Sequence, residues 1–172
     1  GVILAGWFLH RSNKPLALRV PGTDAAPGDA AHSATNPVLL GRLIPGPGEV
    51  GHDTWPEGST EYGGAGPWIT GSWDPELKMY YTGTANAYEW NPKNRGGGEL
   101  DNLGAASIVA VDTAGGKTAW RYSAVPGDPW DYDVPQTPMV ITLDGKKTVV
   151  QPNKTGFIHY LDAKSGAFIK AT

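Results

Sequence analysis

The 172-residue sequence contains no cysteine, and none of its apolar runs approaches the roughly 18 residues typical of a membrane span. Without cysteine these residues offer no thiolate metal ligand, no cysteine nucleophile and no disulfide. Basic residues are not in excess, with 14 Lys and Arg against 17 Asp and Glu, so we expect no nucleic-acid-binding surface. No convincing amphipathic helix is found. The apolar segment 1–9 has neither an initiator Met nor a basic region before it, and we expect no signal peptide there.

Glycine, proline and large aromatic residues are abundant instead. The chain has 24 Gly and 15 Pro, which favour turns, and 7 Trp and 7 Tyr, which argue for a packed core rather than disorder. From Trp68 onward, short apolar and β-branched runs alternate with turn residues, as is typical of strands. The sequence therefore predicts an all-β fold with strands at Trp68–Trp73, Met79–Thr84, Ala106–Asp112, Thr118–Ser123, Met139–Leu143, Thr148–Gln151, Gly156–Asp162 and Ala167–Thr172.

An internal repeat indicates how these strands are arranged. Residues 108–117 resemble residues 158–167, because in both a strand ends in Asp, a short spacer follows, and Gly precedes another strand. The two Asp residues, Asp112 and Asp162, are 50 positions apart, a period typical of solenoids and β-propellers. We therefore predict a partial β-propeller of about three four-stranded blades. Trp120 is predicted to pack between blades, with no catalytic role.

The first part of the chain differs from the rest. Segment 16–36 is rich in Ala, Pro, Gly and Asp, has little periodicity, and is interpreted as loop or disorder. We therefore predict an irregular N-terminal segment at 1–42, followed by the partial propeller at 43–172.

An acidic loop at residues 127–133 is the strongest chemical signal. It places Asp128, Asp131 and Asp133 within six residues, beside Trp130 and Tyr132. Carboxylates this close ionise together only at a cost unless a cation or a proton lies between them. Hard metal ions take oxygen ligands of this kind, and an Asp beside such a metal can act as a base. The alternative is an ordinary solvated acidic turn, and Asp128 is interpreted as a turn residue in either case.

Several short segments in a fixed order carry a resemblance to a known family. The chain resembles part of a pyrroloquinoline-quinone (PQQ) dependent alcohol dehydrogenase of the methanol/ethanol dehydrogenase type, from about Leu43 to Thr172; segment 1–42 does not fit the family pattern. The segments that carry the resemblance are Gly51–Pro56, Trp68–Leu77, Gly83–Asn91, Asp101–Leu103, Pro126–Asp133 and Asn153–Phe157.

The resemblance implies an eight-bladed propeller that holds PQQ and a metal ion, either Ca²⁺ or a lanthanide(III) ion, on its axis. It further implies a periplasmic enzyme that oxidises a small primary alcohol to an aldehyde by hydride transfer to PQQ. The electrons would then pass to a cytochrome c.

Three matching residues imply cofactor and metal contacts. Trp68 corresponds to the tryptophan that lies flat against the quinone, for which an indole offers a large face. Asn86 corresponds to an amide-oxygen ligand of the metal, although Ala85 and Ala87 replace the Gly and Pro that usually flank it. Lys154 corresponds to a basic residue that contacts the quinone oxygens and stabilises negative charge on the reduced cofactor.

Two acids complete the implied site. Asp131 corresponds to the catalytic base, which accepts the hydroxyl proton of the alcohol, and is also a predicted metal ligand. Asp133 corresponds to the additional carboxylate of the lanthanide-dependent branch, because an added anionic oxygen favours a large trivalent ion. In an extended segment the two side chains would point to the same side and reach one ion. Trp130 is expected either to wall the substrate pocket or to pack structurally.

Other interpretations remain open at this stage. The family's glutamate ligand and vicinal cysteine pair correspond to no residue of this chain, and about three blades cannot close an eight-bladed ring. The chain could therefore be a non-catalytic β-sheet module, or a propeller that binds other proteins, and its open blade edges offer a route to oligomers.

Overall fold

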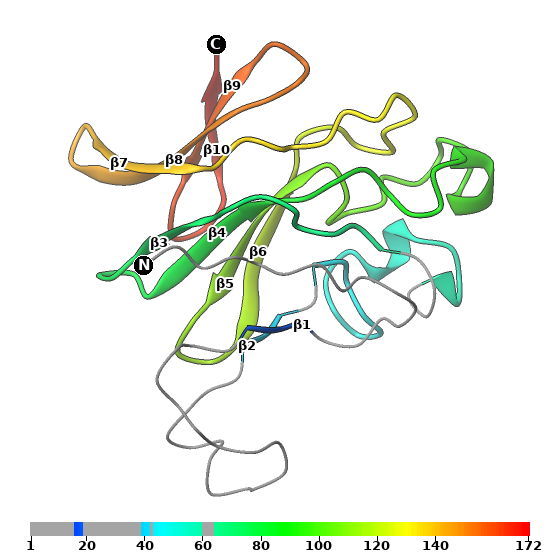
Figure 1. Ribbon diagram of the computed structural model, residues 1–172, viewed down its shortest axis with the longest axis horizontal. Coiled ribbons are helices and arrows are strands. Elements are labelled where there is room, and N and C mark those ends of the chain that lie inside the picture. The colour runs from blue at the N-terminus through cyan, green and yellow to red at the C-terminus, as the bar shows by residue number, and fades with distance from the viewer. Residues whose placement is uncertain (1–15, 19–38, 42, 60–63) are drawn as a thin grey trace, which may run out of the picture.

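The computed structural model describes residues 16–18, 39–41, 43–59 and 64–172, and these residues form antiparallel sheets without any α-helix (Figure 1). Short 3-10 helices occur at η1 (His52–Thr54) and η3 (Pro92–Arg95). In this part of the chain no helix has the length and apolar character required to cross a membrane. The predicted all-β class is confirmed.

Two four-stranded antiparallel sheets make up most of the structure. The first blade has the order β3 (Ser72–Asp74), β4 (Met79–Gly83), β5 (Ser107–Asp112) and β6 (Lys117–Ser123). The second blade runs in the same way through β7 (Met139–Leu143), β8 (Lys146–Pro152), β9 (Ile158–Asp162) and β10 (Phe168–Ala171). Each sheet joins neighbours in sequence order, as expected for a propeller blade.

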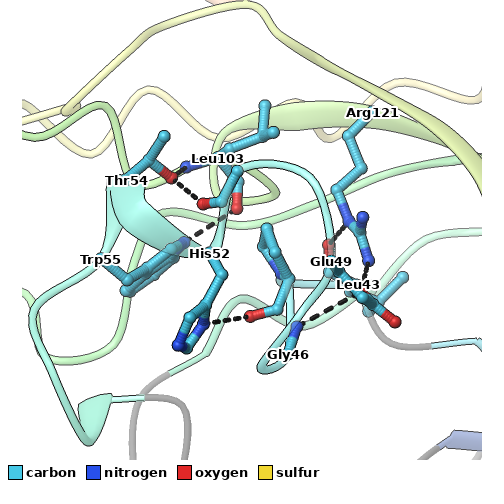
Figure 2. A network of polar contacts seen from close by, with 10 residues as sticks. Leu43, Gly46, Glu49, His52, Thr54, Trp55, Leu103 and Arg121 are labelled. Carbon is cyan, nitrogen blue, oxygen red and sulfur yellow. Dashed lines mark hydrogen bonds and ion pairs between the residues drawn. The ribbon is translucent and has the colours of Figure 1, made fainter.

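Of the predicted segment 1–42, the structure describes only β1 (Leu16–Leu18) and β2 (Leu39–Gly41), which pair antiparallel. The rest of this segment lies outside the described residues, so its predicted irregularity stays a prediction. The following segment, 43–55, packs on the first blade through β6. Arg121 donates from Nε to the Leu43 carbonyl at 2.9 Å and pairs with Glu49 at 2.7 Å (Figure 2).

All eight predicted strands have counterparts, and the largest error concerns Trp68–Trp73. The strand at this position begins only at Ser72. Pro67 has no amide proton to donate to a sheet, and Gly71 allows an approach to Tyr81 and Tyr80 that a Cβ would block. Trp68 therefore lies in an irregular segment before the blade.

The repeat corresponds to the same hairpin in consecutive blades. Asp112 ends β5 and Asp162 ends β9, each just before the fourth strand of its blade. Asp112 Oδ1 accepts from Ala114 N at 2.8 Å, and Asp162 Oδ1 accepts from Ser165 N at 2.8 Å. The Asp is thus repeated because its carboxylate caps the turn.

The core lies between the two blades, and Trp120 is part of it, as predicted. Trp120 Nε1 donates to the Ala163 carbonyl at 3.1 Å, and Tyr81 Oη donates to the same oxygen at 3.0 Å. Gly166 packs beneath the indole, where a Cβ would lie 2.6 Å from a ring carbon. The surrounding buried residues are Ile108, Ala110, Val134, Val149, Leu161 and Ala163.

Candidate functional site

Three loops leave the blades at the same edge. Segments 84–106, 124–138 and 153–157 follow β4, β6 and β8, and strands two apart in an antiparallel meander run in the same direction. In Figure 1 the green and yellow loops that follow β4 and β6 extend from the same side of the sheets. Four of the predicted site residues lie on these loops, namely Asn86, Asp131, Asp133 and Lys154.

Asp133 is bound to the loop that carries Asn86. Asn86 N donates to Asp133 Oδ1 at 2.7 Å, and Val134 N donates to the Thr84 carbonyl at 3.0 Å. Gly83 makes this approach feasible, because a Cβ at that position would overlap the Val134 carbonyl oxygen. The structure thus brings together two residues that lie 47 positions apart in the sequence.

Lys154 reaches the same place from the second blade. Its Nζ donates to the Asp131 carbonyl at 2.5 Å and lies 3.3 Å from Asp133 Oδ2. The Asp133 side chain is only 14% exposed, so its charge is largely removed from water and is balanced by the ammonium. The predicted basic residue therefore lies beside the predicted acids.

Asp131 has an unusual backbone conformation. Its φ is 68°, in the left-handed region that Asp tolerates better than most residues. The predicted extended segment is wrong at this point, because a left-handed residue breaks the two-residue alternation of a strand. The Asp131 carboxylate is exposed and forms no hydrogen bond within the described residues. Its predicted role as base, and its binding of one ion together with Asp133, stay predictions.

Trp68 lies on a segment adjacent to that of Asn86. Ala85 N donates to the Gly66 carbonyl at 3.0 Å, two residues before Trp68. The Trp68 side chain is 61% exposed, so its indole is accessible to a planar ligand. No hydrogen bond joins Trp68 to the predicted metal ligands among the described residues, and the stacking role stays a prediction. Trp130 is likewise exposed, and its ring centroid lies 5.8 Å from that of Tyr132.

A buried network that the sequence did not reveal lies under these loops. Arg95 is 3% exposed and donates to the Asn102 side chain and to the Glu89, Trp90 and Asp128 carbonyls. Asn102 Nδ2 in turn donates to the Thr54 and Arg95 carbonyls. A lone Arg in a glycine-rich loop gives no sequence signal of such burial. The segment Asp101-Asn102-Leu103 is one of those that carry the family resemblance.

Segment 51–55 is bonded to the same loop at Leu103 (Figure 2). Thr54 Oγ1 accepts from Leu103 N at 2.9 Å, and Trp55 Nε1 donates to the Leu103 carbonyl at 2.9 Å. Trp55 is buried, so this Trp supports the loop from below rather than lining the site.

The chemistry of the donors fits a hard metal ion and an anionic cofactor. Asn86, Asp131 and Asp133 bring one amide and two carboxylate side chains to neighbouring loops, and oxygen donors of this kind suit Ca²⁺ or a lanthanide. In the turn that carries Lys154, Asn153 Nδ2 and Thr155 Oγ1 are buried and make no hydrogen bond within the described residues. No group of three or more His, Cys, Asp and Glu able to hold a metal occurs in the described ranges, and metal binding by Asn86, Asp131 and Asp133 stays a prediction.

Comparison with known proteins identifies the family. Residues 41–171 match the family model for the glucose/ethanol/alcohol dehydrogenase PQQ β-propeller domain. The chain is 41% identical over 113 residues to the quinohemoprotein alcohol dehydrogenase ADH IIB of Pseudomonas putida, covering 63% of this chain and 16% of that protein. It is 38% identical over 130 residues to the lanthanide-dependent methanol dehydrogenase of Methylacidiphilum fumariolicum (strain SolV), covering 73% of this chain and 21% of that protein.

Solved structures agree with these matches. A europium-containing methanol dehydrogenase superposes with a TM-score of 0.63 at 34% identity, over 76% of this chain and 23% of that chain. The quinohemoprotein alcohol dehydrogenase from Comamonas testosteroni gives a TM-score of 0.56 at 39% identity, over 63% of this chain and 17% of that one. The chain thus spans about a fifth of the length of its relatives. Because the family model matches residues 41–171 and the sheets have the topology of propeller blades, the chain belongs to the PQQ-dependent alcohol dehydrogenase family and forms part of the β-propeller domain.

Proposed function

We propose that this chain provides two blades and part of the cofactor and metal site of a PQQ-dependent dehydrogenase that oxidises a primary alcohol to an aldehyde. The observation that carries the proposal is the meeting of three loops at Asp133, whose two carboxylate oxygens face Asn86 N and Lys154 Nζ. Family membership and the likeness to a europium-containing methanol dehydrogenase support this assignment.

Each residue then has a defined task. Asp131, whose carboxylate forms no hydrogen bond with the described residues, accepts the hydroxyl proton of the alcohol. Lys154 supplies positive charge beside the cofactor oxygens, and Trp68 presents its exposed indole to the cofactor ring. Asn86 and Asp133, together with Asp131, hold the metal ion through side-chain oxygens. When bound, PQQ supplies the acceptor for the hydride of the alcohol carbon.

The choice of metal and the surroundings of the enzyme follow from the same proposal. The carboxylate of Asp133 adds negative charge to the donor set, and we propose a lanthanide(III) ion as the preferred metal, with Ca²⁺ as the alternative. The electrons pass to a cytochrome c, and the enzyme works in the periplasm.

The decisive test replaces the proposed base in the complete enzyme. Asp131→Asn keeps a residue that tolerates the left-handed φ but removes the proton acceptor, so we expect turnover to fall at least about 100-fold while PQQ and metal remain bound. Asp144 is a matched control, because it is also exposed and left-handed (φ 48°) but lies in the β7–β8 turn, away from the site. Asp144→Asn should retain full turnover. Retained activity in Asp131→Asn would refute the assignment of the base.

A non-catalytic β-sheet module is the second candidate, and the small share of the relatives' length covered by this chain favours it for the chain in isolation. Titration of the isolated chain with PQQ and La³⁺ or Ca²⁺, followed by cofactor absorbance and Trp fluorescence, separates the two. No change in either signal would support the module. The predicted oligomerisation through open blade edges can be checked on the same sample by sedimentation.

A further inference from the structure

Arg95 and Asp128 are buried charged residues, joined by a hydrogen bond to the Asp128 backbone, that the proposed reaction does not use directly. Both residues are 3% exposed, and Arg95 Nη2 donates to the Asp128 carbonyl at 2.5 Å. The other acceptors of Arg95 are also neutral, since they are backbone carbonyls and the Asn102 amide. Burial lowers the pKa of Arg95, and the negative charge of Asp128 partly offsets this effect. Burying a guanidinium charge against neutral acceptors costs folding free energy. This cost points to a function for Arg95.

The Asp128 carboxylate holds the backbone on both sides of Asp131. Its Oδ1 accepts from Trp130 N at 2.9 Å, and its Oδ2 accepts from Tyr132 N at 2.6 Å. The residue between these two amides is Asp131, with its left-handed φ of 68°. A sparsely populated conformation of this kind persists only where the surroundings determine it, and the two hydrogen bonds do so here.

We propose that Asp128 and Arg95 are positioning residues for Asp131. Arg95 holds the Asp128 backbone against segment 89–102, and Asp128 in turn imposes the left-handed turn at Asp131, whose backbone carbonyl accepts from Lys154 Nζ. The proposal rests on the proposed function, because it assigns a role relative to the proposed base.

Comparison with the other turn aspartates shows what is particular to Asp128. Asp162 also caps a turn, but its contacts with Lys164 N, Ser165 N and Ser165 Oγ all go to Oδ1, and it is less buried. Asp128 instead uses both oxygens and encloses a left-handed residue. Asp162 therefore provides a matched control, since its loss removes a turn cap at a distance from the site.

The test compares the kcat of four variants, Asp128→Ala, Asp128→Asn, Arg95→Lys and Asp162→Ala, in the complete enzyme loaded with PQQ and La³⁺. Asp128→Ala removes both acceptors, and we expect kcat to fall about 100-fold, because a displacement of about 1 Å at a reacting group has an effect of this size. Asp128→Asn keeps one acceptor but places an amide group opposite an N–H, so we expect an intermediate loss with an unchanged KM. Asp162→Ala should keep the kcat of the wild type.

Amide hydrogen exchange provides a second test that does not depend on catalysis. It keeps the proposal testable if Asp128→Ala fails to fold. Amide hydrogen exchange at Trp130 and Tyr132 should be slow in the wild type and faster in Asp128→Asn and Arg95→Lys, but unchanged in Asp162→Ala. Arg95→Lys retains the charge, yet an ammonium cannot serve the four acceptors that the guanidinium reaches.

The outcomes separate the two levels of the proposal. Faster exchange together with lower kcat in the Asp128 and Arg95 variants supports the positioning role. Wild-type kcat in Asp128→Asn and Arg95→Lys, or an equal loss in Asp162→Ala, overturns it while the proposed function stands. A wild-type enzyme without PQQ-dependent turnover overturns the proposed function and this inference with it.

Discussion

Asp133 is held between two loops, with Oδ1 2.7 Å from Asn86 N and Oδ2 3.3 Å from Lys154 Nζ. The same carboxylate thus joins a backbone amide of the first blade to a cation of the second. Charge and hydrogen bonding at Asp133 can be separated by substitution, because Asn retains a carbonyl oxygen for the Asn86 amide but carries no charge.

If the charge of Asp133 favours a trivalent ion, Asp133→Asn and Asp133→Ala should both lower the affinity for La³⁺ by at least about tenfold, or about 1.4 kcal/mol. The affinity for Ca²⁺ should fall less, because a divalent ion gains less from an added anion. Competition with luminescent Tb³⁺ in the complete enzyme measures both affinities. An unchanged ratio of La³⁺ to Ca²⁺ affinity in Asp133→Asn would remove the proposed basis for lanthanide preference.

Contact between the blades should depend on Trp120. Trp120→Phe removes the hydrogen bond to the Ala163 carbonyl and part of a buried ring, so we expect the free energy of unfolding to fall by roughly 1–3 kcal/mol. Tyr81→Phe should cost less, about 1 kcal/mol, because Trp120 still donates to the same oxygen. Urea denaturation followed by circular dichroism measures both.

Trp73→Phe is the control for this pair, since Trp73 is 59% exposed on β3 and should change the free energy of unfolding little. Equal losses at Trp73 and Trp120 would contradict the assignment of Trp120 as the residue that joins the blades.

Because of the ion pair between Asp74 and Lys147, the free energy of unfolding should fall as the pH is lowered into the acid range. Lys147 donates to Asp74 Oδ2 at 2.8 Å, and this bond is the largest cause that lowers the pKa of Asp74 from its ordinary value of 3.8, although burial opposes it. Because the folded-state pKa lies below the unfolded one, the stabilisation is complete above about pH 3.8 and is lost as pH falls through the folded-state pKa.

The alkaline side follows with the opposite sign. Lys147 has its pKa raised from 10.5, chiefly by the hydrogen bond to Asp74, so its contribution is complete below pH 10.5 and is lost as pH rises through the folded-state pKa. The midpoint of thermal unfolding should be measured from pH 3 to pH 11 for the wild type and for Lys147→Met. The difference between the two midpoints should be largest between about pH 3.8 and pH 10.5. A difference that does not vary with pH would show that Lys147 acts through packing alone.

The sequence predicted the strands because their signals are local. Alternating apolar runs, the Asp that ends β5 and β9, and the Gly after each turn depend on neighbours within a few residues. The placement of Trp120 between blades also followed from its position just after the repeated turn, early in the next strand. The error at Trp68–Trp73 arose because the residues between Pro67 and Gly71 do not join the sheet, and the strand begins only at Ser72.

The site was only partly accessible to sequence reasoning. The family segments pointed to Asn86, Asp131, Asp133 and Lys154, and the loops that carry them do meet. The left-handed backbone of Asp131 contradicted the assumption of an extended segment, because the conformation is set by hydrogen bonds to Asp128 rather than by local preference.

By itself, the sequence determined the all-β class, the blade repeat and the candidate acids, because patterns over a few residues decide which segments form strands and turns. Only the tertiary structure decided that Asp133 bridges Asn86 and Lys154, and that Arg95 is buried against Asp128. These contacts join residues from 21 to 47 positions apart, and they form only when the folded sheets bring loops of different strands to one edge.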